Sequence, residues 1–393
     1  MSGSSTSTGP GTRSGRGPAR VAAAVAVAVA VLAPLAVLGA QVRSSTGDSL
    51  SFVRDERRGV TYLRPLTRLL GATTEAQSAA VRGRPVDAAG VRSAVAAVEE
   101  ADRRVGGALR TTDRWTSVRA TVADRISRPG WPQATTAYTQ YSDLNTALLQ
   151  LSRTVGDNSR LVLDPATDAY YVMDAALLRI PAILVDSGRY ADLSILSGAG
   201  DDAAAGGPAQ PAGTGPATDQ AQLAAARNRI ATDATDLSDG LVKAFGGTGS
   251  GTLALGLTRQ LGDFRTAVDA VAPSTSLLAP VPERSLTDLA RDQATLHRAA
   301  LALQDAALDQ LDLLLAARAS DTQRTRAVAL AATALGVLVA AGLVLLVWRR
   351  SVPAPAPDRV AASGASGPEE TMGTAVRAMP VRAERLGGAR VAR

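Results

Sequence analysis

The chain has 393 residues, of which 46% are hydrophobic and only 3% aromatic, and it contains no cysteine. The absence of cysteine excludes disulfides, thiolate metal sites and a cysteine nucleophile. Alanine, leucine and valine supply most of the apolar content, and this composition favours helix over sheet. The net charge of +6 would by itself suit a nucleic-acid or acidic-lipid partner.

The excess positive charge lies at the two ends of the chain. Residues 1–20 carry three arginines and no acid, and residues 349–393 carry eight arginines against four acids. The long middle is therefore nearly neutral. This distribution argues against nucleic acid, and we predict no nucleic-acid partner.

Two uncharged, apolar segments occupy residues 21–40 and 327–348. Each has about the 20 residues that are needed to cross a hydrocarbon core of about 30 Å. A buried core helix is the alternative for each segment, and a cleaved signal peptide is a further alternative for the first. Arginines on the outer flank of both segments place both chain ends in the cytoplasm by the positive-inside rule. We therefore predict a multi-pass protein of the inner (cytoplasmic) membrane, with residues 41–326 outside.

Glycine and proline divide the predicted outer domain into segments of helical character. They cover residues 44–81, 87–126, 133–155, 164–197, 219–245, 252–271 and 283–325. The Gly-, Ala- and Pro-rich stretch 198–216 is predicted to be a flexible loop. The last segment has apolar residues at a period of 3.6 and runs into the second span, as the first segment continues the first span.

These features predict an all-α fold, namely an elongated antiparallel helical bundle outside the membrane, flanked by two transmembrane helices. The N-terminal residues 1–20 are predicted to be cytoplasmic and disordered. Residues 349–393 are predicted to form a short, basic cytoplasmic tail. This tail is either disordered or an amphipathic helix on acidic lipid.

The segment 52–66 carries the first unusual pattern. On a helix, Glu56 and Gly59 interrupt an otherwise apolar seam. A glycine inside a helix costs about 1 kcal/mol relative to alanine, so Gly59 predicts the close approach of a neighbouring element. Pro65 removes a backbone donor and predicts a bend. The surrounding arginines are Arg54, Arg57, Arg58 and Arg64.

The segment 161–181 carries the second pattern. Asp164 before Pro165 predicts a helix start, because the carboxylate caps free amides and proline suits the first turn. A stripe of apolar and aromatic residues is predicted to face the core, and Pro181 predicts a kink. The stripe is Tyr170, Met173, Leu177, Ile180 and Leu184.

We predict that these two kinked segments meet and form a polar ligand-binding pocket inside the bundle. The candidate ligand-binding residues are Glu56, Arg57, Tyr62, Tyr170, Tyr171, Asp174 and Arg179. The alternative is a purely structural role, with helix capping, packed tyrosines whose hydroxyls reach water, and solvated arginines.

The motif ERRGVTYLRPL at 56–66 and the motif LDPATDAYYVMDAALLRIP at 163–181 together resemble the periplasmic sensing regions of methyl-accepting chemotaxis proteins. Related sensor kinases and diguanylate cyclases share this input region. The resemblance covers roughly residues 51–197. It implies a helical bundle that senses a small-molecule ligand or a partner, transmits a small motion through the second span, and acts as a homodimer or with a partner receptor or kinase.

Receptors of this kind continue past the second span into a HAMP linker and an output domain. Here residues 350–355 resemble only the entry to a HAMP segment, and a Pro-, Ala- and Gly-rich sequence follows. We therefore expect a sensory input module without its own output domain, which signals through a partner. A structural or scaffolding protein of the cell envelope, or a decayed receptor, is the alternative.

No catalytic constellation is predicted. His297 is the chain's one histidine, and we expect it on the surface or in a groove. The stretch 246–251 is rich in glycine but lacks the Lys-Ser/Thr ending of a phosphate loop, so it is predicted to be a linker. We expect no enzymatic activity, no cofactor and no metal.

Overall fold

In a computed structural model of the chain, helices make up the regular secondary structure of the residues that the structure describes. The structure describes residues 16–128, 130–161, 167–204, 216–247, 252–273 and 285–351. No strand occurs in these described residues. The prediction of an all-α fold is therefore confirmed.

The chain divides into two compact units. One comprises Met1–Val25 together with Leu343–Arg393, and the other is Ala26–Gly342. Within the first unit, the described residues belong to the first turns of α1 and the last turns of α10. All packing described below lies within Ala26–Gly342.

Two helices of 66 residues each dominate the fold, α1 (Arg16–Val81) and α10 (Leu286–Ser351). At a rise of 1.5 Å per residue, each is about 100 Å long. Each contains a stretch that is long and apolar enough to cross a membrane, and among the residues of these stretches whose side chains the structure describes, almost none is buried. The predicted continuity of the first and last helical segments with the apolar stretches is confirmed.

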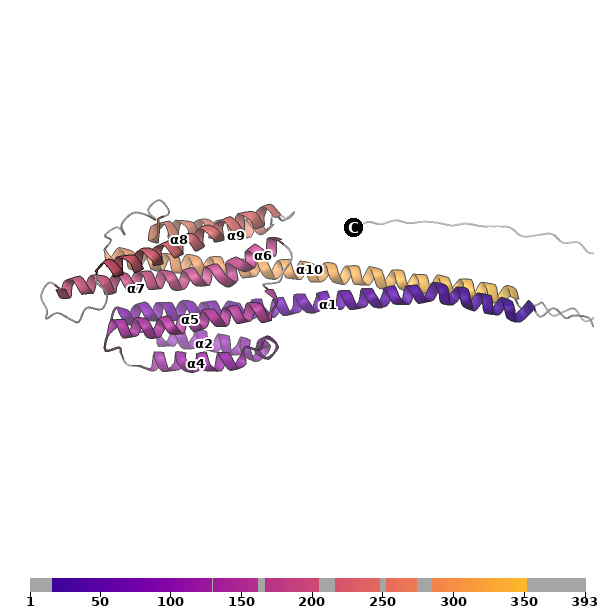
Figure 1. The fold of residues 1–393 in the computed structure, drawn as a ribbon, viewed down its shortest axis with the longest axis horizontal. Coiled ribbons are helices and arrows are strands. Elements are labelled where there is room, and N and C mark those ends of the chain that lie inside the picture. The colour runs from indigo at the N-terminus through magenta and orange to yellow at the C-terminus, as the bar shows by residue number, and fades with distance from the viewer. Residues whose placement is uncertain are drawn as a thin grey trace, which may run out of the picture. The chain divides into compact units, whose positions relative to one another are not determined.

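α1 and α10 lie side by side within the larger unit (Figure 1). In the outer part, Arg57 forms an ion pair with Asp312 at 2.8 Å. In the apolar part, Gly39 faces Thr333 so closely that a Cβ on the glycine would lie 3.2 Å from Cγ2 of the threonine.

Between these two helices in sequence lies a first group of packed helices. They are α2 (Ala88–Ala101), the π-helical η1 (Asp102–Gly106), α3 (Gly107–Leu109), α4 (Thr112–Ser127) and α5 (Ala134–Asn158). Asp87 starts α2 by accepting a hydrogen bond from the amide of Gly90 at 2.9 Å. Arg110 ends α3 in the left-handed region, at φ 52°. The segment predicted as one helix over 87–126 therefore folds back on itself.

A second group comprises α6 (Thr167–Asp174), the π-helical η3 (Ala175–Arg179), α7 (Ile180–Ala204), α8 (Pro216–Gly247) and α9 (Thr252–Val271). The start predicted at Asp164 lies outside the described residues. Helix extends to Ala204 in the stretch predicted as loop, where alanine favours helix. The rest of that loop, 205–215, and of the linker, 248–251, lies outside the described residues.

At both ends of the chain, helix likewise extends beyond its predicted limits. Helix α1 begins at Arg16, within the segment 1–20 that was predicted to be disordered. Helix α10 reaches Ser351, and residues 352–393 of the predicted tail lie outside the described residues.

The two predicted proline bends have different outcomes. Helix α1 passes Pro65 without interruption. Before Pro181 the helix widens into η3, which frees backbone carbonyls. The carbonyl of Leu177 accepts from the hydroxyl of Ser152 at 3.5 Å, and that of Ala176 accepts from the amide of Gln304 at 2.8 Å. Side chains from α5 and α10 thus donate hydrogen bonds to the freed carbonyls of the irregular turn.

Candidate functional site

A groove of about 880 Å³ lies between α1, the α2–η1 segment and α10. Its buried lining is apolar and includes Val53, Val60 and Ala101, each at most 7% exposed. Its polar lining is mostly cationic. The charged residues are Arg54, Arg57, Arg58, Arg64, Arg68 and Arg104, with Glu100 and Asp312. The volume lies in the range typical of small-molecule sites, about 300–1,000 Å³.

Most of the groove's arginines are held by carboxylates. Arg57 donates from Nε and Nη2 to the two carboxylate oxygens of Asp312, at 2.8 and 3.2 Å. This hydrogen bonding and the charge of Asp312 raise the pKa of Arg57. Arg64 pairs with Asp309 at 2.6 Å. These pairs fix the arginines along the line where α1 meets α10.

Two arginines at the other end of the groove differ from each other. Arg58 is paired with Asp55 on its own helix at 2.6 Å. Arg54 is exposed, and it makes no ion pair or hydrogen bond with the side chains of the described residues. The Arg54 guanidinium is therefore available to an anionic group from outside the chain.

Glu56 and Tyr62 come from the same turns of α1 but lie in the interior, each with 0% exposure. The hydroxyl of Tyr62 donates to Asp102 at 3.1 Å, and the hydroxyl of Thr111 donates to the same oxygen at 3.0 Å. Burial raises the pKa of Tyr62. These contacts attach α1 at Tyr62 to η1 and to the start of α4.

Gly59 is the point where the two unusual segments meet. A Cβ on this glycine would lie 2.4 Å from Oγ of Ser159 and 2.7 Å from Cδ1 of Leu161. The predicted close approach at Gly59 is therefore confirmed, and its neighbour is the start of the second segment.

The second segment forms a cluster of its own, centred on Arg179. Its guanidinium contacts Asp174 at 3.3 Å, Asp233 at 2.6 Å and Asp236 at 2.9 Å. Partial burial disfavours the charged form, but the hydrogen bond to Asp233 and the three carboxylate charges outweigh it and raise the pKa of Arg179. The cluster joins η3 to α8.

Tyr170 and Tyr171 lie beside that cluster, in edge-to-face contact with ring centroids 5.3 Å apart. The ammonium of Lys243 lies 5.7 Å from the centre of the Tyr171 ring. Tyr170 is 44% exposed, so its predicted place on the core stripe is wrong. The other four residues of the stripe are buried, so only its first residue, in the first turn of α6, departs from the prediction.

The seven predicted site residues therefore divide into three sets. Arg57 lines the groove, Glu56 and Tyr62 are buried, and the remaining four lie around η3. Within the described part of the chain, none of those four lines the groove. The segments meet through Gly59, while their candidate side chains stay apart.

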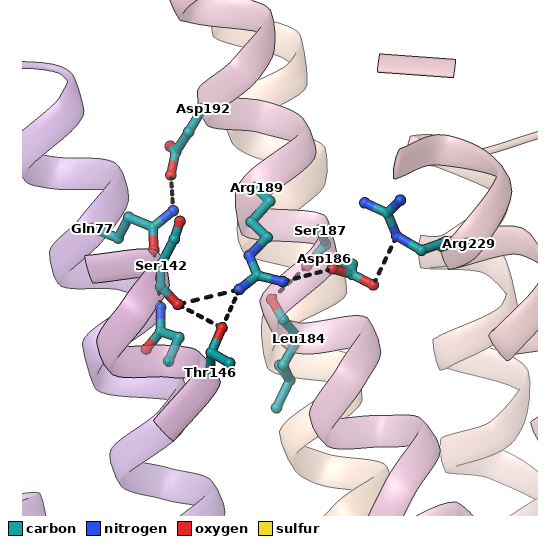
Figure 2. A network of polar contacts seen from close by, with 10 residues as sticks. Gln77, Ser142, Thr146, Leu184, Asp186, Ser187, Arg189, Asp192 and Arg229 are labelled. Atoms are coloured by element: carbon teal, nitrogen blue, oxygen red, sulfur yellow. Dashed lines mark hydrogen bonds and ion pairs between the residues drawn. The ribbon is translucent and has the colours of Figure 1, made fainter. Parts of the chain in front are cut away.

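A buried polar network lies farther along α1 (Figure 2). The amide of Gln77 donates to Asp192 at 2.9 Å and accepts from Asn145 at 3.0 Å, and all three side chains are at most 1% exposed. Burial raises the pKa of Asp192 to about 6. Arg189 reaches from α7 to the Ser142 carbonyl at 3.2 Å and to the Thr146 hydroxyl of α5 at 2.7 Å.

The sequence analysis missed this network because glutamine, asparagine and aspartate on a helix normally indicate its solvent face. The predicted position of the His297 side chain was also wrong. It was predicted on the surface or in a groove, but it is 2% exposed, because Gly71 makes room for its ring. Burial lowers its pKa to about 4, so at neutral pH it does not form an ion pair with Glu75, which lies 3.6 Å away.

Among the described residues, no group of three or more histidine, aspartate or glutamate side chains is placed to hold a metal ion. No family model matches the chain, and no curated protein matches it. Among solved structures, the chain is similar to that of the NasR transcription antiterminator, with a TM-score of 0.41 and 17% sequence identity. The similarity covers 81% of this chain and 82% of that one. It is too distant to carry an inference about fold or function.

Proposed function

We propose that the chain is a membrane-anchored sensory module of chemoreceptor type, whose domain over residues 41–326 lies outside the cytoplasmic membrane and binds a small-molecule ligand. Both chain ends are then cytoplasmic, and the module acts as a homodimer or with a partner receptor or kinase. The helices outside the spans form an antiparallel bundle.

The observation that carries this proposal is the course of α10. Asp312, Ala319 and Gln323 line the groove, and the same helix continues without a break into the second apolar stretch. A ligand in the groove would therefore contact the helix that enters the membrane. No other element intervenes between the binding event and the span.

Topology is the first test, and the lack of cysteine makes it direct. A single cysteine replacing exposed Asp239 would be the only thiol in the chain, and a membrane-impermeant maleimide added to intact cells should label it. Labelling only after the cells are broken would contradict the proposed topology. A cysteine at the cytoplasmic end, in place of Ser14, should behave in the opposite way.

Ligand sensing is the second test. The full chain in nanodiscs should be stabilised against heat by members of a panel of small acids, amino acids and amines. Arg54→Gln should weaken the effect, whereas Arg119→Gln, an arginine paired with Glu99 outside the groove, should keep it in full. A panel without any stabilising compound, together with no protein captured from membranes, would favour a scaffolding role instead.

A further inference from the structure

The groove combines two kinds of surface that rarely occur together in a site for a small polar ion. Its buried lining is aliphatic, from Val53, Val60 and Ala101, and the exposed Ala97 continues it. Arginines stand along the same length of α1. A ligand that covers the aliphatic part and also pairs with arginine must carry an apolar portion and an anionic portion.

The groove is also long. Its lining on α1 runs from Leu50 to Arg68, which at 1.5 Å per residue corresponds to about 27 Å. A small oxyanion or an amino acid would fill only a short part of this length. An extended alkyl chain would occupy much more of it.

The position of the groove relative to the predicted first span is the third observation. Leu50 follows the end of that span at Ala40 by ten residues of continuous helix, or about 15 Å. The unpaired Arg54 lies in the next turn. The end of the groove nearest the membrane is thus both apolar and supplied with an available cation.

We propose that the groove binds a single-chain anionic amphiphile, a long-chain carboxylate presented at the outer membrane surface. Its carboxylate pairs with Arg54, and its alkyl chain covers the apolar lining residues that keep exposed surface, Leu50, Ala97 and Ala319. Arg57 and Arg64 keep their own carboxylates on one side of the site. This inference rests on the proposed sensory function, for which it names the class of ligand.

Photolabelling of the full chain in phosphatidylcholine nanodiscs tests the proposal. The probe is a sixteen-carbon fatty acid with a diazirine at mid-chain, and labelled peptides are mapped by mass spectrometry. We expect labelling of residues 50–68, 97–104 and 312–323, in addition to the spans. Excess dodecanoate should suppress labelling of the groove, butyrate should leave it unchanged, and 1-dodecanol should need a concentration about two- to fivefold higher than dodecanoate for the same suppression.

Variants locate the site. Arg54→Gln should lower groove labelling about two- to fivefold, the effect of losing one exposed ion pair. Ala97→Trp, which places a large side chain at an exposed lining position, should abolish it. Arg119→Gln should leave it unchanged, and labelling of the spans should be the same in all variants. Circular dichroism verifies that each variant is folded.

Three results would overturn the amphiphile. Butyrate could compete as well as dodecanoate does, or 1-dodecanol could compete as well as dodecanoate does. The third such result is groove labelling that neither Arg54→Gln nor Ala97→Trp lowers. Stabilisation by a different anion, with no amphiphile labelling, would refute this ligand class and leave the sensory function in place. Cytoplasmic labelling of the cysteine at position 239 would refute the sensory function itself.

Discussion

The two faces of α1 place their polar side chains in opposite environments, one exposed to water and one buried. On the groove face, Arg57 and Arg64 pair with α10 carboxylates that are themselves well exposed. On the interior face, Gln77 joins Asp192 and Asn145 away from water. Exposed ion pairs contribute little because water screens them and competes for them. Buried polar groups cost free energy unless each finds its partner. The comparison teaches that the interior network fixes how the helices pack, while the exposed ion pairs of the groove face contribute little to that packing.

The largest effect is expected in the interior. Gln77→Leu removes the donor to Asp192 and the acceptor for Asn145, so both are left buried without this partner. We expect a loss of about 3 kcal/mol in the free energy of unfolding, measured by thermal and denaturant unfolding of the full chain in detergent. Gln323→Leu, on the groove face, is the control and should change it by less than about 0.5 kcal/mol. Equal losses would refute the comparison.

The pH dependence of stability sharpens the same contrast. The pKa of Asp192 is raised to about 6 in the folded chain, so its protonation stabilises the fold as the pH falls from about 7 to 4. The pKa of His297 is lowered to about 4, so over the same range the unfolded chain takes up a proton first and the fold is destabilised. Each effect amounts to about 3 kcal/mol, and the two oppose each other.

Single substitutions should therefore separate the two groups. Asp192→Asn should make stability fall as the pH is lowered from 7 to 4, and His297→Gln should make it rise. Burial also raises the pKa of Glu75 and of Asp186, and both act in the direction of Asp192. Unfolding measured at several pH values checks this prediction. A pH profile that neither substitution changes would contradict it.

Two glycines of α1 give a paired test of close packing. Gly59→Ala should cost about 1–3 kcal/mol, because its Cβ would overlap Ser159 and Leu161. Gly47→Ala should instead stabilise the fold by up to about 1 kcal/mol, because nothing lies within 4 Å of its added Cβ. Unfolding of the two variants under identical conditions gives the comparison, and the same sign for both would contradict it.

The smallest effect is expected on the groove face. A double-mutant cycle of Arg57→Gln and Asp312→Asn should give a coupling free energy of about 0.2–1 kcal/mol, since both side chains are 40% or more exposed. The cycle is measured by unfolding, and the coupling should fall at high salt. A coupling as large as the effect of Gln77→Leu would show that this face also fixes the packing.

Much of the fold follows from local sequence patterns. Prolines and glycines indicate most helix ends, and the apolar period of residues 283–325 predicts the long helix into the second apolar stretch. The break at Arg110 was missed, because an arginine in the left-handed region has no sequence signal of its own. Gly106 and Gly107, just before it, were the available hint.

The candidate site was less predictable, for a physical reason. The groove needs Ala97 from α2 and Asp312 from α10 beside Arg57, and periodicity within one segment cannot pair residues so far apart. Two residues that are adjacent in sequence can also differ completely in their exposure to solvent. Glu56 has no exposed surface while Arg57 is 48% exposed, and only the packing of neighbouring helices decides which of them faces the groove.

The π-helical turn at Ala175–Arg179 has a consequence for the ancestry of the chain. A π-helical turn accommodates one more residue than the α-helical turn it replaces, so it corresponds to a single-residue insertion that the fold absorbed without a loop. Relatives that lack the insertion should align with a one-residue gap between Asp174 and Ile180. In those relatives the partners of the freed carbonyls, Ser152 and Gln304, should be replaced by apolar residues.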